Sequence, residues 1–181
     1  EVICGEASEV MAGLPDGCVD LVVTSPPYWG LRNYGVDAQI GLEKTPEEFI
    51  ANVVRIFDQV KRVLKPHGTC WLNIGDSYSG GSSGDRKIGV NDNTRSRKRE
   101  FVKGMKPKDL CLIPFKLAIA LQEAGWWVRS DIIWYKRNPM PESVTDRPTK
   151  AHEYMLLLTK SAKYYYDLEA VKTESVAIDN Y

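Results

Sequence analysis

Short apolar runs alternate with amphipathic stretches along this chain, an order that predicts β-strands separated by helices. Residues 19–23 form a β-branched run bounded by turn signals, and residues 69–74 form a second such run. Both are expected to be buried strands. Further strands are predicted at residues 1–4, 127–136 and 153–159.

Two helices are predicted between these strands. Thr45 is suited to cap the first helix, Pro46 fits the first helical position, and Glu48 completes a capping box. Apolar residues then recur at helical spacing as far as Leu64 and give this helix one apolar face. Residues 110–124 are the second predicted helix, with a proline in the first turn and a glycine directly after the end.

The alternation of strand, helix and strand predicts the α/β class, with a parallel sheet covered by helices. The last two strands are expected to form an antiparallel hairpin at the edge of the sheet. A chain of 181 residues, 43% of them hydrophobic, is long enough for one domain with a buried core. Trp126, Trp127 and Trp134 are expected to belong to that core.

The formal net charge is zero, but the charges are unevenly distributed. Residues 86–108 contain nine basic and two acidic residues, a net charge of +7, which leaves −7 for the rest of the chain. Residues 79–108 show no helical or strand period, so we interpret them as a basic, mobile insertion. Such a loop is either simply solvated or a basic arm that contacts phosphates. We favour the arm, whose densest cluster is Arg95, Arg97, Lys98 and Arg99.

The four cysteines are widely scattered without a Cys-x-x-Cys pair, and only two histidines accompany them. This pattern predicts no metal site. No apolar stretch approaches the roughly 20 residues that a membrane-spanning helix needs, and no signal peptide is evident. We therefore expect a cytoplasmic protein with reduced cysteines and no membrane partner.

The clearest chemical pattern is Thr24-Ser25-Pro26-Pro27-Tyr28-Trp29-Gly30, which directly follows the predicted strand at residues 19–23. Two consecutive prolines make a rigid, extended turn, because each fixes its own φ and restricts the residue before it. Ligands bind at the carboxyl ends of strands in open α/β sheets. Here backbone carbonyls and the Ser25 hydroxyl would stand beside the Tyr28 ring. Hydrogen-bond acceptors next to a stacking face suit a planar group with an amino function, such as a nucleobase.

This turn resembles the catalytic motif Ser/Asp/Asn-Pro-Pro-Tyr/Phe/Trp of the amino-methylating DNA methyltransferases, which use S-adenosylmethionine to methylate N4 of cytosine or N6 of adenine. The resemblance covers nearly the whole chain. Segments in the order expected of that family are residues 2–7, 14–20, 68–76, 134–136 and 147–154. It implies a Rossmann-like sheet with helices on both faces and a C-terminal β-hairpin.

The resemblance also implies roles for the residues of the motif. The Ser25 side chain and the Pro26 carbonyl would accept hydrogen bonds from the two amino hydrogens, Pro27 would help to hold the turn rigid, and Tyr28 would stack on the base. Accepting both hydrogens favours a pyramidal nitrogen with an available lone pair, which is a form of electrostatic preorganisation. The target base must first leave the duplex by base flipping.

The serine form of the motif is typical of cytosine-N4 enzymes. The expected function is therefore site-specific methylation of cytosine N4 in DNA, as in restriction-modification systems. An adenine-N6 enzyme is the nearest alternative. Methylation of RNA bases or of a protein glutamine, and a catalytically incomplete DNA-binding module of the same fold, are further alternatives.

Six other residues are candidates for binding. Gly5, Glu6, Thr24 and Asp76 are expected near S-adenosylmethionine, although a turn-forming role is an equal alternative for Asp76. Arg147 and Lys150, in the connector before the last strand, are candidate contacts to DNA phosphates. The alternative for both is solvated loop charge.

The chain departs from the family in one respect. The enzymes that it resembles most carry a Phe-x-Gly-x-Gly cofactor loop after a strand, and this sequence has none. Residues 1–181 are therefore interpreted as the catalytic half of a methyltransferase domain, with the half that holds the cofactor loop outside the chain. A C-terminal segment and a restriction endonuclease are the protein partners left open, and no oligomeric state is predicted.

Overall fold

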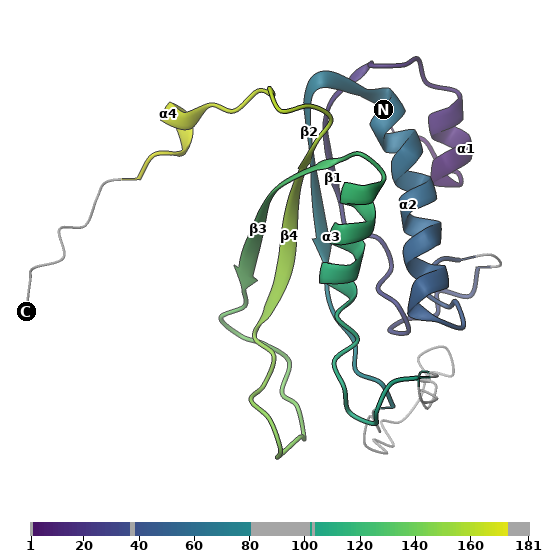
Figure 1. Ribbon diagram of the computed structural model, residues 1–181, viewed down its shortest axis with the longest axis vertical. Helices are drawn as coiled ribbons and strands as arrows, with labels where there is room; N and C mark the ends of the chain where they lie inside the picture. Colours follow the sequence, from purple (N-terminus) through teal and green to yellow (C-terminus); the bar gives the residue numbers. More distant parts are fainter. Residues whose placement is uncertain (1, 37–38, 81–101, 103, 174–181) are drawn as a thin grey trace, which may run out of the picture.

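The computed structural model describes residues 2–36, 39–80, 102 and 104–173, which form a four-stranded sheet with helices beside it (Figure 1). The strands are β1 (Val19–Thr24), β2 (Leu64–Ile74), β3 (Trp127–Tyr135) and β4 (His152–Thr159). They lie in the order β1-β2-β4-β3, with β1 parallel to β2 and the other neighbours antiparallel. The α/β class and the antiparallel pairing of the last two strands are thus confirmed.

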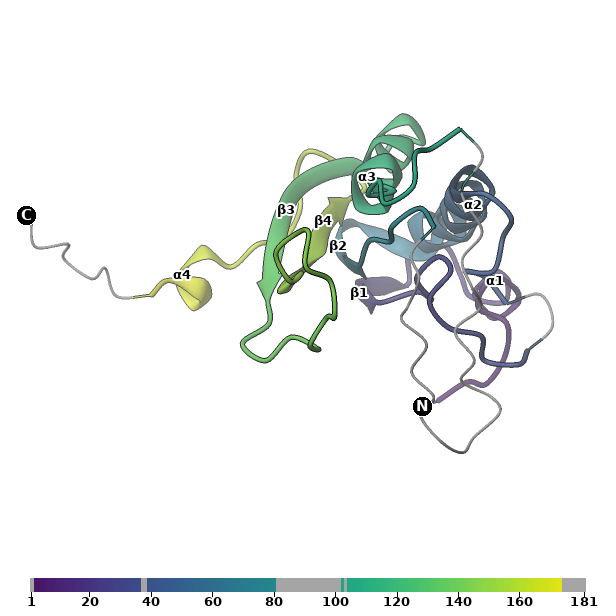
Figure 2. The ribbon, with the colours of Figure 1, turned by 90° about the horizontal axis from the view of Figure 1, so that it is seen from below.

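The helices are α1 (Ala7–Ala12), α2 (Pro46–Val63), α3 (Ile113–Glu123) and α4 (Leu168–Val171). Figure 2 shows α1, α2 and α3 together on one side of the sheet. The burial of β2 agrees, because Cys70, Leu72 and Ile74 belong to the core with residues of α2 and α3, whereas the residues between them are partly exposed. The sequence predicts helices on both faces of the sheet, and among the described residues they cover one.

The opposite face of the sheet leaves apolar side chains exposed. Val23 of β1 is 67% exposed and Trp134 of β3 is 55% exposed. The core position expected of Trp134 is therefore wrong, and so is that of Trp127, which is 45% exposed. Trp126 does lie in the core, with its ring edge-on to Phe57 at 6.2 Å between centroids.

The local signals at the start of α2 act as expected. The Thr45 hydroxyl accepts a hydrogen bond from the Glu48 amide at 3.2 Å, and Pro46 occupies the first turn. The Glu48 carboxylate accepts from the Lys44 amide at 3.1 Å, one residue earlier than in a reciprocal capping box. Cap and proline together explain why the helix begins here.

The end of α2 leads straight into β2, which begins five residues before the predicted strand at 69–74. Val19 pairs with Leu64 and Leu21 pairs with Thr69, so the register shifts within a short stretch. The extra residues of β2 form an irregularity that accommodates Pro66, a residue without an amide hydrogen for the ladder.

The N-terminal prediction is wrong. Residues 2–4 form no strand, and α1, which the sequence analysis does not predict, follows them. The Glu6 carboxylate caps this helix by accepting a hydrogen bond from the Glu9 amide at 3.0 Å. A short apolar segment becomes a strand only where a neighbour pairs with it, and the described chain offers none here.

Candidate functional site

The Ser-Pro-Pro-Tyr turn follows β1 and lies beside the end of β2. Trp29 fixes it to the core, because this residue is only 8% exposed and its indole N–H donates to the Glu43 carbonyl at 3.1 Å. The buried Ser77 hydroxyl donates to the Trp29 carbonyl at 2.8 Å. Trp29 is therefore a packing residue rather than part of a stacking wall.

The Tyr28 hydroxyl lies at the centre of a polar cluster. It is 2.7 Å from Asn73 Oδ1 and 2.9 Å from Glu153 Oε2, so β2 and β4 both contribute to the cluster. The exposed Ser25 Oγ lies 3.3 Å from Asn73 Oδ1 and 3.4 Å from the Tyr28 hydroxyl. The turn and both strands thus place one carboxylate, one amide and two hydroxyls within hydrogen-bond reach of one another.

Two further contacts orient this cluster. The Asn73 amide nitrogen donates to the Tyr154 carbonyl at 3.2 Å, which directs Oδ1 toward the two hydroxyls. The other oxygen of Glu153 forms an ion pair with Lys136, just after β3. Burial alone would raise the pKa of Glu153, but hydrogen bonds from Lys136 and Tyr28 hold it below its usual value.

The Tyr28 hydroxyl is held in its neutral form. Burial raises its pKa to about 12, and the adjacent Glu153 carboxylate acts in the same direction, while the hydrogen bond from Ser25 opposes them. Tyr28 therefore acts as a hydrogen-bond donor and acceptor rather than as a phenolate. Its stacking role stays a prediction.

The carboxyl edge also explains the position of Asp76. Its Oδ1 accepts from the Ser77 amide at 2.8 Å and from the Ile113 amide at 3.0 Å, so Asp76 caps α3 from a distant part of the chain. The capping alternative is thus present in the structure. Oδ2 is buried without a hydrogen-bond partner among the described residues.

The other expected cofactor contacts are dispersed. Thr24 ends β1 next to Ser25. Gly5 and Glu6 lie at the start of α1, where the Glu6 carboxylate is engaged by Glu9 and by the Ser8 hydroxyl at 3.1 Å. Of these four residues, Asp76 has a buried oxygen left for a further donor, so the described residues offer an acceptor but no complete cradle for a cofactor.

The expected phosphate contacts in the connector are packed rather than freely solvated. The Arg147 guanidinium lies 4.1 Å from the Tyr78 ring centroid and pairs with Glu142 at 2.6 Å. Lys150 Nζ is buried without a partner among the described residues, and burial lowers the pKa of this ammonium group. Contact with DNA stays a prediction for both. The expected cluster Arg95, Arg97, Lys98 and Arg99 lies outside the described residues.

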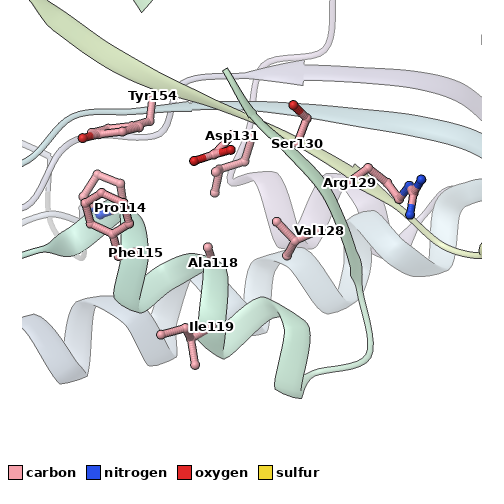
Figure 3. Close-up of a pocket in the computed structure, with 10 residues that line it drawn as sticks. Pro114, Phe115, Ala118, Ile119, Val128, Arg129, Ser130, Asp131 and Tyr154 are labelled. Carbon is pink, nitrogen blue, oxygen red and sulfur yellow. The ribbon is translucent and has the colours of Figure 1, made fainter. Parts of the chain in front are cut away.

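A cavity of about 320 Å³ lies between α3 and the β3–β4 hairpin (Figure 3). Phe115 and Ile119 of α3 line it from one side, and Val128 and Asp131 of β3 from the other. Tyr154 reaches Phe115 edge-on, with 5.1 Å between ring centroids. None of the residues of the Ser-Pro-Pro-Tyr turn lines this cavity, so it is separate from the polar cluster.

The structure adds three residues that the sequence analysis does not single out: Asn73, Lys136 and Glu153. Asn73 and Glu153 are polar positions near the ends of otherwise apolar strands, which is the signal available in the sequence. No group of three or more His, Cys, Asp and Glu residues suited to a metal ion occurs in the described part of the chain. Within the same part, no helix is long and apolar enough to cross a membrane.

Comparison with known proteins agrees with this arrangement. A family model described as "DNA methylase", for N6 and N4 methyltransferases, matches residues 19–179. The Type II methyltransferase M.Cfr9I of Citrobacter freundii is 54% identical over 172 residues, which cover 94% of this chain and 57% of that protein. The chain thus spans little more than half the length of this relative.

Solved structures show the same fold. The cytosine-N4-specific PvuII DNA methyltransferase matches with a TM-score of 0.63 at 17% identity, covering 92% of this chain and 51% of that one. TTHA0409 of Thermus thermophilus, a DNA modification methylase solved with S-adenosyl-L-methionine, matches with a TM-score of 0.59 at 24% identity, covering 92% of this chain and 55% of that one.

Proposed function

Because this chain belongs to the N6/N4 DNA methylase family, we propose that it carries the catalytic turn of a site-specific Type II DNA methyltransferase. The proposed reaction transfers a methyl group to the exocyclic N4 of a cytosine flipped out of duplex DNA. Since the chain spans 57% of the length of M.Cfr9I, the proposal concerns the part of the active site formed by these residues.

The observation that carries the proposal is the environment of Ser25. This residue is exposed at the carboxyl end of β1, beside the half-buried Tyr28. Its hydroxyl has donor partners to choose from in Tyr28 and Asn73, so its oxygen is free to accept a hydrogen bond from an incoming amino group. The Pro26 carbonyl is the proposed second acceptor.

These acceptors address the difficulty of the reaction. The lone pair of an exocyclic amino group is delocalised into the ring, which makes the nitrogen a poor nucleophile. Two fixed acceptors for its hydrogens favour a pyramidal nitrogen, and a fixed position allows in-line attack on a methyl group. The proline pair holds both acceptors on one rigid turn, so they need no rearrangement during the reaction.

S-adenosylmethionine is the proposed methyl donor, and when bound it supplies an electrophilic methyl group on a sulfonium. The family and the complex of TTHA0409 support this choice. Asp76 is the described residue that best fits a contact, through its unpartnered oxygen. Gly5, Glu6 and Thr24 are weaker candidates. DNA is the proposed substrate, with Arg147, Lys150 and the cluster at residues 95–99 as its proposed phosphate contacts.

Cytosine is proposed over adenine for two reasons. The motif has its serine form, and the fold matches a cytosine-N4-specific enzyme with a TM-score of 0.63. Adenine N6 is the second candidate, because the family includes both specificities. A restriction endonuclease that shares the recognition sequence is a proposed partner, in keeping with the Type II relatives.

Nucleoside mass spectrometry tests the proposal. DNA is incubated with the chain and S-adenosylmethionine, digested and analysed for methylated bases. We expect N4-methylcytosine with the wild-type chain and none with Ser25→Ala. Ser161→Ala is the matched control, because that hydroxyl bonds to the Pro66 and Lys163 carbonyls, far along the chain from the turn. N6-methyladenine would overturn the choice of base, and equal activity of Ser25→Ala would overturn the role of the turn.

A further inference from the structure

A continuous hydrogen-bond path leads from the Ser25 hydroxyl into the polar cluster. Ser25 Oγ is 3.4 Å from the Tyr28 hydroxyl, and this hydroxyl is 2.9 Å from Glu153 Oε2. Each hydroxyl has one proton to donate. Ser25 can donate to Tyr28 while Tyr28 donates to Glu153, so the path has a single direction and ends on a carboxylate.

The competing acceptor on this path is Asn73 Oδ1, at 2.7 Å from the Tyr28 hydroxyl. An ionised carboxylate is the stronger acceptor of the two. When Tyr28 donates to Glu153, Asn73 Oδ1 is left to accept from Ser25 at 3.3 Å and holds this hydroxyl against the path. The amide is itself fixed by its bond to the Tyr154 carbonyl, so the cluster keeps one arrangement.

We propose that Glu153 receives the proton that methyl transfer releases, through Tyr28 and Ser25. This rests on the proposed function. The amino nitrogen attacks the methyl carbon, and the bond between that carbon and sulfur breaks with its electron pair on sulfur. The nitrogen then carries a positive charge and loses a proton to Ser25 Oγ. The Ser25 proton passes to Tyr28, and the Tyr28 proton passes to the Glu153 carboxylate.

The charges around Glu153 suit this role. Lys136 pairs with the carboxylate oxygen that does not face Tyr28, and Lys150 contributes a more distant positive charge. These cations keep Glu153 ionised and ready to accept before the reaction. A methylated nitrogen that bears a positive charge and is conjugated to a pyrimidine is a much stronger acid than a carboxylic acid, so the transfer is downhill even to this carboxylate. The Glu153 side chain is 21% exposed, which lets the proton pass on to water.

Single-turnover methylation measures the effect. Glu153→Gln keeps a side chain of the same size that still accepts from Tyr28 but cannot take up a proton. We expect its rate to fall by about 10²-fold, as for other acid–base groups. Tyr28→Phe removes the middle of the path and is expected to fall similarly. Because both changes interrupt one path, the double variant should be no slower than the slower single variant. Glu169→Gln, which breaks an exposed ion pair with Lys172, is the matched control.

Chemical rescue separates proton acceptance from a merely structural role. In Glu153→Ala, added acetate at constant ionic strength should restore the rate at least tenfold, whereas chloride should not. Tyr28→Phe should not respond to acetate. Failure of acetate to rescue Glu153→Ala, or full activity of Glu153→Gln, would overturn the proposal while leaving the proposed function in place.

A second readout needs neither cofactor nor DNA. The ultraviolet titration of the wild-type chain minus that of Tyr28→Phe isolates the Tyr28 phenol. Replacing Glu153 by Gln removes the negative charge next to this phenol, so the Tyr28 pKa should fall from about 12. An unchanged titration would show that the path does not exist. A wild-type chain that yields no methylated base would instead end the proposed function, and the proton acceptor with it.

Discussion

The Tyr28 ring lies directly against the backbone of Gly75. A Cβ atom placed on Gly75 would stand 2.5 Å from Tyr28 Cε2 and 2.8 Å from Cδ2, much closer than side chains approach one another. The absence of a side chain at this position therefore allows the ring to lie where its hydroxyl reaches Asn73 and Glu153.

Gly75→Ala is expected to displace the Tyr28 ring. Overpacking of this kind costs about 1–3 kcal/mol, so chemical denaturation should show a lower free energy of unfolding by that amount. Methylation should fall as well, because the Ser25–Tyr28–Glu153 contacts are broken. Gly13→Ala is the control, since a Cβ there meets only the Val10 carbonyl at 3.4 Å. Equal stability of the two variants would contradict the packing of Tyr28 on Gly75.

The pKa of Tyr28 predicts how stability depends on pH. The folded pKa of about 12 lies above the ordinary value of 10.0, so the folded state binds this proton more tightly than the unfolded state does. The resulting stabilisation is complete below pH 10 and is lost as the pH rises toward 12. Urea denaturation at pH 9 and pH 11 should therefore show a larger loss for the wild type than for Tyr28→Phe. The difference is expected to be below about 1 kcal/mol, because the ring is only half-buried. Parallel losses would contradict it.

Asp76 is predicted to stabilise the protein as the cap of α3. Asp76→Ala leaves the Ser77 and Ile113 amides without this acceptor and should lower the free energy of unfolding by about 1–2 kcal/mol. Asp76→Asn keeps an oxygen in the same place and should cost much less. Thermal denaturation of the three proteins measures this order. An Asn variant as unstable as the Ala variant would point to a need for the charge.

Local signals predicted the helices well, because their causes lie within a few residues. The cap at Thr45 and the proline at Pro46 begin α2, and Gly125, with φ +83°, ends α3. The strand expected at residues 1–4 failed because strand formation depends on a neighbour that no local pattern reveals.

The candidate site was predictable only in part, for a similar reason. Ser25 and Tyr28 belong to one short motif, and the sequence singles them out. Glu153 lies 125 residues after Tyr28, and the two meet because β4 pairs with β2 in the middle of the sheet. The sequence predicts β4 but not this pairing order, so it offers no way to connect the carboxylate to the turn.

The cysteines provide a test of the core. Cys4 and Cys18 are exposed, whereas Cys70 and Cys111 are buried. Burial raises the pKa of Cys70 to about 12, and a thiol reacts through its thiolate. Mass spectrometry after brief treatment with iodoacetamide at pH 8 should find two modified cysteines in the native chain and four after unfolding. Rapid native modification of Cys70 would contradict its place between the sheet and the helices.

The basic cluster in the insertion predicts a salt-dependent affinity for DNA. Each phosphate contact made by a cation contributes nearly 1 to the slope of log affinity against log salt. Replacing all four cluster residues by serine should reduce this slope by about 3 to 4, with a uniform effect on all DNA sequences. The residues changed are Arg95, Arg97, Lys98 and Arg99.

The control for this experiment removes the same charge elsewhere. Its four serine substitutions are at Lys44, Arg55, Lys163 and Lys172, which lie outside the insertion. A loss of net charge alone would weaken binding equally in both quadruple variants, because long-range attraction depends on the total charge. Direct phosphate contact instead predicts a reduced slope in the insertion variant only. Fluorescence anisotropy with a labelled duplex at several salt concentrations measures both slopes, and identical slopes would leave the insertion as a solvated loop.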